Sequence, residues 1–146
     1  MQEQIESVVQ MQSVATRFVH GLIPRANGAT VVALLGDLGA GKTTFMQGVA
    51  KALGVTGQVT SPTFVLEKVY KLRDQQFDHL IHIDAYRLEN AHEARGLGWD
   101  ELLLNRNNVV CVEWADRLGD AIPENAIVIK FQFVSDTVRQ ITWPKS

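Results

Sequence analysis

The sequence predicts an α/β fold, a three-layer sandwich built on a mainly parallel sheet with antiparallel additions. Three observations predict it. The run "TVVALL" (Thr30–Leu35) is continuously apolar and β-branched, which is typical of a strand covered on both faces. The run "NVVCVEW" (Asn108–Trp114) repeats that pattern. Between them the apolar spacing changes to the helical period of 3.6 residues, and strands that alternate with helices favour a parallel sheet.

The first expected element is a helix over "SVATRFVHGLI" (Ser13–Ile23), whose apolar residues fall on one helical face. Ser13 is the expected N-cap, because its hydroxyl can accept from a free N–H of the first turn. The turn "RANGA" (Arg25–Ala29) leads to the strand at Thr30–Leu35. A second helix is expected over "TTFMQGVAKAL" (Thr43–Leu53), and Gly54 predicts its end.

In the middle of the chain, "FVLEKVYKL" and "FDHLIHID" read as two strands joined by the polar turn "RDQQ". They are expected to be antiparallel neighbours. Asn90 with Glu93 predicts a helix start of the capping-box type, and "WDELLL" predicts a further short helix. After the strand at Asn108–Trp114, "AIVIKFQFV" alternates apolar and polar residues, which predicts a half-exposed strand. The segment "RQITW" is expected to pair back onto it.

Composition excludes several classes of protein. The 146 residues fit one domain, with a net charge of −2 that argues against a broad nucleic-acid surface. The single cysteine, Cys111, lies in an apolar run and is expected to be buried and inert. No apolar run approaches the roughly 20 residues that span a bilayer. The N-terminus lacks the pattern of a signal peptide, so we expect a cytoplasmic protein without membrane contact.

The segment "GDLGAGKTT" (36–44) matches the phosphate-binding pattern G-x-x-x-x-G-K-[ST] at Gly36, Gly41, Lys42 and Thr43. Glycines allow backbone N–H groups to approach a triphosphate, and the following helix directs its free N–H groups at it. Lys42 is expected to sit between the β- and γ-phosphates, and Thr43 to bind Mg²⁺. The expected nucleotide contacts of the loop also include Asp37, Leu38, Gly39, Ala40 and Thr44. A strand before the loop and a helix after it favour this interpretation over a plain turn.

Two acids end apolar runs, Asp84 in "HLIHID" and Glu113 in "VVCVEW". Ligands of open parallel sheets bind beyond the carboxyl ends of the strands, so either acid can face the phosphates and a metal ion. Asp84 fits the second magnesium ligand by residue type, and Glu113 fits it by its longer apolar run. For each, the alternative is a strand-end acid that caps a turn or pairs with a base such as Arg87.

Other residues are ambiguous. "SPT" (Ser61–Thr63) stands where a GTPase has its γ-phosphate-sensing loop, and Thr63 is a nucleotide-binding candidate, although Ser-Pro also begins ordinary turns. His82 is interpreted as a core histidine in preference to a catalytic base. Arg87 is either an internal arginine finger or an ion-pair partner. Trp114 adjoins Glu113 and is a candidate to flank the site.

Nothing in the chain matches the Asn-Lys-x-Asp segment that reads guanine, which leaves adenine as the expected base. There is also no evident arginine-bearing lid insert of the kind that nucleoside kinases use. Together the motifs predict a P-loop NTPase-like domain over residues 1–146 that binds ATP and Mg²⁺.

Five segments, "GDLGAGKTT", "SPTF", "HIDAYRLE", "GLGWDELL" and "VVCVEWADRL", resemble in order and spacing the bacterial TsaE family, also called YjeE. The resemblance covers about residues 13 to 143. It implies a small ATPase needed to make threonylcarbamoyladenosine at position 37 of ANN-decoding tRNAs. The implied partners are TsaB and TsaD, with TsaD performing the transfer and tRNA reached through these partners.

The resemblance also implies roles for residues. Lys42 would be the phosphate lysine, Thr43 and Glu113 the magnesium ligands, and Asp84 the acid needed for hydrolysis. Family members contact nucleotide from the N-terminal helix and from an arginine near the C-terminus. Gln12 (or Ser13) and Arg139 are the nearest matches, so they are further nucleotide-binding candidates.

Two other functions fit the same loop. A small-molecule kinase would use Asp84 to take the proton of its acceptor. A nucleotide-gated interaction module would bind ATP with negligible turnover. Release of phosphate without any acceptor distinguishes the ATPase from the kinase, and tight binding without hydrolysis identifies the module.

Overall fold

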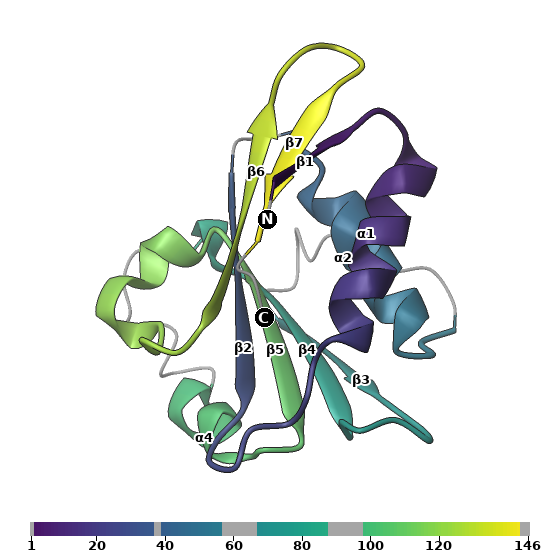
Figure 1. The fold of residues 1–146 in the computed structure, drawn as a ribbon. Coiled ribbons are helices and arrows are strands. Elements are labelled where there is room, and N and C mark those ends of the chain that lie inside the picture. Colours follow the sequence, from purple (N-terminus) through teal and green to yellow (C-terminus); the bar gives the residue numbers. More distant parts are fainter. Residues whose placement is uncertain (1, 37–38, 57–66, 88–97, 144–146) are drawn as a thin grey trace.

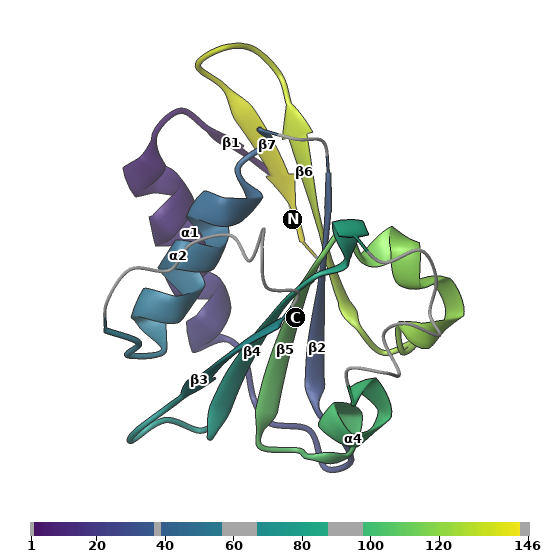
Figure 2. The same ribbon diagram turned by 180° about the vertical axis from the view of Figure 1, so that it is seen from behind.

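The computed structural model describes residues 2–36, 39–56, 67–87 and 98–143. One seven-stranded sheet runs through it, and helices cover both faces of this sheet (Figures 1 and 2). The strands are β1 (Gln2–Ile5), β2 (Thr30–Gly36), β3 (Glu67–Lys71), β4 (His79–Asp84), β5 (Asn108–Glu113), β6 (Ile127–Phe133) and β7 (Arg139–Thr142). Their spatial order is β1-β7-β6-β2-β5-β4-β3. The predicted α/β fold is confirmed.

Four neighbouring strands form a parallel centre. β2 pairs in parallel with β5 and β6, and β4 pairs in parallel with β5. The outer strands are antiparallel, with β3 on β4 at one side and β7 on β6 at the other. Both antiparallel pairs were predicted and are confirmed. β2, β4 and β5 are almost entirely buried and apolar because both of their faces are covered, whereas β6 is half exposed, as predicted.

One strand was not predicted. β1 pairs antiparallel with β7, with Gln2 opposite Thr142 and Ile5 opposite Arg139. Its sequence is polar apart from Ile5, which is the buried residue of the strand. A short, polar edge strand has little periodic pattern in its sequence. The position of β1 is therefore determined by its pairing with β7 and not by a pattern in its own residues.

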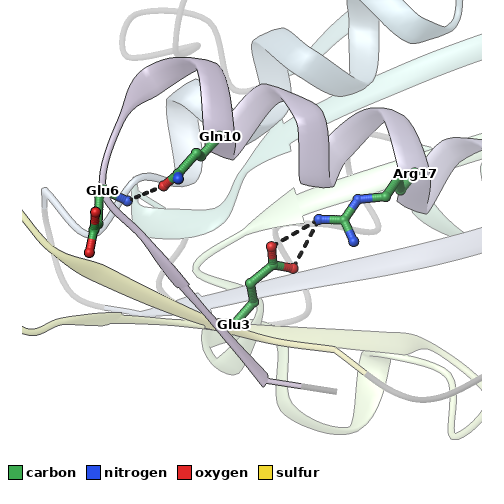
Figure 3. Close-up of polar contacts among 4 residues, drawn as sticks. All are labelled: Glu3, Glu6, Gln10 and Arg17. Carbon is green, nitrogen blue, oxygen red and sulfur yellow. Dashed lines mark hydrogen bonds and ion pairs between the residues drawn. The ribbon is translucent and has the colours of Figure 1, made fainter.

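The predicted start of the first helix is wrong. Helix α1 spans Val8–His20, and its N-cap is Ser7, whose hydroxyl accepts from the N–H of Gln10 at 3.1 Å. The Gln10 side chain in turn accepts from the N–H of Glu6 at 2.6 Å (Figure 3). Ser13 is therefore an exposed residue inside the helix. Arg17 also pairs with Glu3, which ties α1 to β1.

Helix α2 (Lys42–Ala52) packs beside α1 on one face of the sheet, in a close contact at Gly48. The other face carries α4 (Trp99–Leu104) and a 3₁₀ segment, η2 (Ala115–Ala121) (Figures 1 and 2). Each face has its own apolar cluster, with Phe45, Met46 and Leu34 in the α1–α2 layer. Trp99, Ile81 and Leu118 belong to the opposite layer.

Candidate nucleotide-binding site

The glycine-rich loop joins the end of β2 to the start of α2, as the sequence predicts. Gly36 is the last residue of β2, Gly41 is the N-cap of α2, and Lys42 is its first residue. Free N–H groups of the first turn therefore lie where the loop ends, which is the geometry that binds phosphate. Asp37 and Leu38, two of the predicted contacts, lie outside the described residues.

Gly41 is required by its conformation and by its surroundings. Its φ is +105°, in the left-handed region that side chains rarely adopt. A Cβ at this position would come within 2.6 Å of the Met11 Cε atom of α1. The loop thus fits beneath the first turns of α1 because position 41 has no side chain.

Lys42 is a buried cation at the centre of the site, with 5% of its surface exposed. Its Nζ donates to the carbonyl of Gly36 at 2.5 Å and lies 3.7 Å from the centroid of the Trp114 ring. The carbonyl and the face of the indole both stabilise a positive charge that has lost most of its water. The lysine is therefore held inside the loop, where an incoming phosphate would meet it.

Trp114 holds this position through an unusual backbone. Its φ of 58° and ψ of 41° are left-handed, which is rare for a bulky residue. The turn occurs directly after β5 and directs the indole to the Lys42 side. Tyr86 packs against the same indole with ring centroids 5.1 Å apart. The sequence-based suggestion that Trp114 flanks the site agrees with this geometry.

Asp84 and Glu113 are direct neighbours in the sheet. They are register partners at the ends of β4 and β5, and Glu113 is also the partner of Leu34 near the end of β2. Only 6% of Asp84 and 4% of Glu113 is exposed. Both acids therefore lie at the edge of the sheet from which the glycine loop departs, as predicted for strands that run in parallel.

Each acid also has a structural contact. Asp84 Oδ1 accepts from the N–H of Tyr86 at 2.9 Å and so caps the 3₁₀ turn η1 (Ala85–Arg87). Glu113 Oε2 lies 2.6 Å from His82 Nε2. A carboxylate has a second oxygen, so neither contact prevents a role toward a metal ion.

The donor set suits Mg²⁺. Two carboxylates and the hydroxyl of half-buried Thr43, in the first turn of α2, are hard oxygen ligands. Within the described residues, no three side chains of His, Cys, Asp or Glu form a metal-binding group. In nucleotide-binding proteins, Mg²⁺ takes most of its ligands from phosphates and waters and only one or two from the protein.

Cys111 lies on β5 two residues before Glu113 and is fully buried. Burial, with a smaller contribution from the charge of Glu113, raises the pKa of its thiol to about 12. The thiol therefore stays protonated and unreactive at neutral pH, as the composition predicted.

A cavity of about 290 Å³ adjoins the loop. Gly39, Gly41 and Thr44 form one wall, and residues of the β1–α1 turn and of the β6–β7 hairpin form the others. Arg139, a predicted nucleotide contact, lines this cavity. Gln12, the other predicted contact, is not among the residues that line this cavity, and its backbone lies against α2 at Gly48.

Arg139 joins the hairpin to the loop. Its Nε donates to the carbonyl of Gly39 at 2.9 Å, and its Nη1 donates to the carbonyl of Ser135 at 2.6 Å. The guanidinium also lies 4.4 Å above the ring of Phe133. Arg139 therefore supports the backbone of the loop as well as facing the cavity.

Several lining residues were missed by sequence reasoning. Ser7 and Glu6 come from the β1–α1 turn, and Asp136 and Thr137 come from the hairpin. Ser7 belongs to a helix-cap spacing with Gln10, but none of the four lies in a nucleotide-binding motif, and only the folding of β1 and β7 together brings them near the loop. Thr63 and the remainder of "SPT" lie outside the described residues, as do the side chain of Arg87 and the predicted helix start at Asn90.

Comparison with known proteins identifies the family. The family model described as "Threonylcarbamoyl adenosine biosynthesis protein TsaE" matches residues 5–141. The chain belongs to the TsaE family. A TsaE protein of Bacillus subtilis is 40% identical over 118 residues, which cover 81% of this chain and 71% of that protein. A TsaE protein of Treponema pallidum is 37% identical over 113 residues, covering 77% and 80% respectively.

A solved structure agrees with this assignment. The crystal structure of Bacillus subtilis YdiB matches with a TM-score of 0.76 and 30% identity, over 98% of this chain and 83% of that one. The match to the TsaE family spans the loop, both acids and Arg139. Among the described residues, none of the helices combines the length and the apolar character needed to cross a membrane.

Proposed function

We propose that this TsaE-family chain is a single-domain ATPase that acts in the formation of threonylcarbamoyladenosine at position 37 of tRNA. It works in the cytoplasm with the TsaB–TsaD complex and reaches tRNA through these partners. The observation that carries the proposal is one cluster. Buried Lys42, the start of α2 and the adjoining acids Asp84 and Glu113 meet at one edge of the sheet.

The phosphates would bind at the loop. The N–H groups between Gly39 and Thr44 cradle them, and Lys42 neutralises the charge between the β- and γ-phosphates. Binding requires Lys42 to exchange the Gly36 carbonyl for phosphate oxygens, which are stronger partners because they are charged. Removing Lys42 should therefore cost affinity and leave the fold intact.

The nucleoside would occupy the 290 Å³ cavity beside the loop. The walls offer apolar surface from Met11 and Val8, and carboxylates from Glu6 and Asp136 that can accept from hydroxyl or amino groups. We assign Arg139 to this subsite, where it supports the loop through Gly39.

The two acids would divide the remaining work. With Mg²⁺ bound, the ion supplies charge stabilisation at the phosphates, and Thr43 and Glu113 hold it. Asp84 lies at the end of β4, which is next to β5 on the side away from β2. We assign it to orient the water that attacks the γ-phosphate. The Asp84 contact to Tyr86 fixes one oxygen and so limits the directions that the carboxylate can take.

The proposal for partners rests on family membership. Relatives that match most of this chain are named tRNA threonylcarbamoyladenosine biosynthesis proteins. A net charge of −2 fits a protein that leaves tRNA contact mainly to others. A small-molecule kinase on the same loop is the alternative, and it would require an acceptor before the γ-phosphate leaves.

The test measures phosphate release from Mg-ATP by the pure protein, alone and with TsaB, TsaD and tRNA. We expect slow release alone and faster release with the partners. Lys42→Ala should lower ATP affinity by about tenfold to a hundredfold, which corresponds to one or two charged hydrogen bonds. Lys51→Ala is the matched control, because Lys51 lies in the last turn of the same helix.

Three results would count against the proposal. Wild-type ATP affinity in Lys42→Ala would contradict the assignment of the phosphate site. Formation of ADP that appears only after a small-molecule acceptor is added, with the γ-phosphoryl group on that acceptor and without free phosphate, would favour the kinase. A rate that does not respond to the partners would contradict the role in tRNA modification and leave the nucleotide site standing.

A further inference from the structure

His82 is a buried titratable side chain that the proposed function does not use. It lies on β4, two residues before Asp84, and 0% of its surface is exposed. Its register partner on β5 is Cys111, and Glu113 is the next residue on the same face of β5. This diagonal relation brings His82 Nε2 to 2.6 Å from Glu113 Oε2.

Packing alone does not explain a histidine at this position. Its Nδ1 has no hydrogen-bond partner within the part of the chain that the structure describes. A buried polar atom without a partner destabilises a fold, so an aliphatic residue would fill this space at lower cost. The neighbouring residue on this face, Leu80, is aliphatic and equally buried. The contact to Glu113 is therefore what distinguishes His82 from a core residue.

The contact has a direction. An ionised carboxylate only accepts hydrogen bonds, so with Glu113 ionised the hydrogen is on Nε2 and the imidazole donates to Oε2. A glutamate side chain has three rotatable bonds, and one strong hydrogen bond from a rigid neighbour removes much of that freedom. His82 is itself fixed by the apolar core around β4.

We propose that His82 is a positioning residue that fixes the Glu113 carboxylate so that its other oxygen addresses the divalent cation of a bound nucleotide. The inference rests on the proposed function, which assigns Glu113 to the metal ion. It is the arrangement in which a second residue orients a metal ligand and tunes its affinity without touching the metal.

The test compares nucleotide affinity with and without Mg²⁺, by calorimetry with ADP, because binding reports on the cation independently of turnover. His82→Gln places a donor near the position of Nε2 and should keep the enhancement by Mg²⁺ within about threefold of wild type. His82→Asn and His82→Leu remove the contact and should lower that enhancement by about tenfold or more, the usual effect of losing such a partner. ADP affinity in EDTA should stay within about twofold of wild type in all three.

Two controls separate the possible results. Cys111→Ala perturbs the same layer beside His82 without a polar contact to Glu113, and it should retain the enhancement by Mg²⁺. Glu113→Gln tests the proposed function itself and should lose the enhancement. Thermal unfolding of each variant confirms that it is folded, and the Gln and Asn pair remains informative where His82→Leu does not fold.

The outcomes are distinct. Full enhancement in His82→Asn, or an equal loss in Cys111→Ala, would overturn the positioning role of His82. Full enhancement in Glu113→Gln would instead show that the metal assignment of the proposed function is wrong. Loss in Glu113→Gln and His82→Asn, with retention in His82→Gln and Cys111→Ala, would support both.

Discussion

At the scale of single residues, the site depends on charges that the fold has removed from water. Lys42, Asp84 and Glu113 are each less than a tenth exposed. Burying a charge is unfavourable unless a partner compensates, and each of these has one in Gly36, Tyr86 or His82. The arrangement holds one cation and two acids in fixed positions, as the proposed binding of phosphate and of a metal ion requires.

Cys111 gives a prediction on pH dependence. Its pKa is raised from an ordinary value of 9.0 to about 12 in the folded protein, chiefly by burial. The unfolded chain therefore loses this proton first, so the contribution to stability is complete below about pH 9 and declines as pH rises toward 12. Above pH 9, the wild type should lose unfolding free energy relative to Cys111→Ala by up to about 1.4 kcal/mol per pH unit.

Urea denaturation of the two proteins at pH 8, 9.5 and 10.5 measures this difference. The comparison cancels the titration of the lysines and tyrosines, which both proteins share. A stability difference that stays constant to pH 10.5 would mean that the Cys111 thiol does not carry a raised pKa.

For the cluster of Lys42, Asp84 and Glu113, the sequence predicts the residues better than it predicts their contacts. A motif with a strand before it and a helix after it identified Lys42 and Thr43, and apolar runs identified Asp84 and Glu113. The Trp114 turn and the His82 contact were not predictable in detail, because the first depends on a left-handed backbone at a bulky residue. The second depends on the register between β4 and β5, which no local pattern encodes.

At the scale of elements, the start of α1 shows how a local signal can be missed. Ser7 and Gln10 form the Ser-x-x-Gln spacing that marks a helix N-terminus, and the structure uses both. Ser13 has similar chemistry but lies inside the helix, because the buried face of α1 continues on both sides of it, from Met11 to Val19. The lines of buried residues in β2, β5 and α2 were strong signals, which is why those elements were predicted correctly.

The contact between α1 and α2 gives a prediction on stability. A Cβ added at Gly48 would lie 2.7 Å from Ala15 Cβ and 3.0 Å from Gln12 Cα, so the helices would have to separate. Gly48→Ala should lower the free energy of unfolding by about 1–3 kcal/mol, the usual cost of overpacking a core. Denaturant unfolding monitored by circular dichroism measures it.

Gly21→Ala is the matched control. Gly21 ends α1 with φ of −88°, and its added Cβ would meet only backbone oxygens at 3.6 and 3.8 Å. Because alanine is unstrained there and restricts the unfolded chain, this variant should be neutral or stabilised by up to about 1 kcal/mol. Equal destabilisation of the two variants would show that the close approach of the helices is not the cause.

At the scale of the whole molecule, the sheet order determines the site. Segments at residues 5–11, 39–44 and 136–139 line one cavity although they are far apart in the chain. The order β1-β7-β6-β2 brings them together, because β1 pairs with β7, β7 pairs with β6, and β6 pairs with β2, the strand that leads into the loop. Sequence patterns predict the parallel centre of the sheet and the glycine loop. They do not predict the cavity, because it forms only when β1 pairs with β7.

This arrangement predicts that nucleotide stabilises the whole fold. A ligand that contacts the β1–α1 turn, the loop and the β6–β7 hairpin links three parts of the structure, and it binds only the folded chain. At a hundredfold excess over Kd, Mg-ADP should add about 2.7 kcal/mol of stability. For a chain of this size the midpoint of thermal unfolding should then rise by about 5–10 °C.

Variants locate the source of that rise. Lys42→Ala should abolish most of it, and Arg139→Ala should reduce it, because Arg139 joins the hairpin to the carbonyl of Gly39. Arg25→Ala is the matched control: Arg25 also donates to a distant backbone carbonyl, that of Asn125 at 2.7 Å, but does not line the cavity. Equal losses in Arg139→Ala and Arg25→Ala would mean that general loosening of the fold explains the effect. A full rise in Arg139→Ala would remove Arg139 from the nucleotide site and leave the hairpin with a purely structural role.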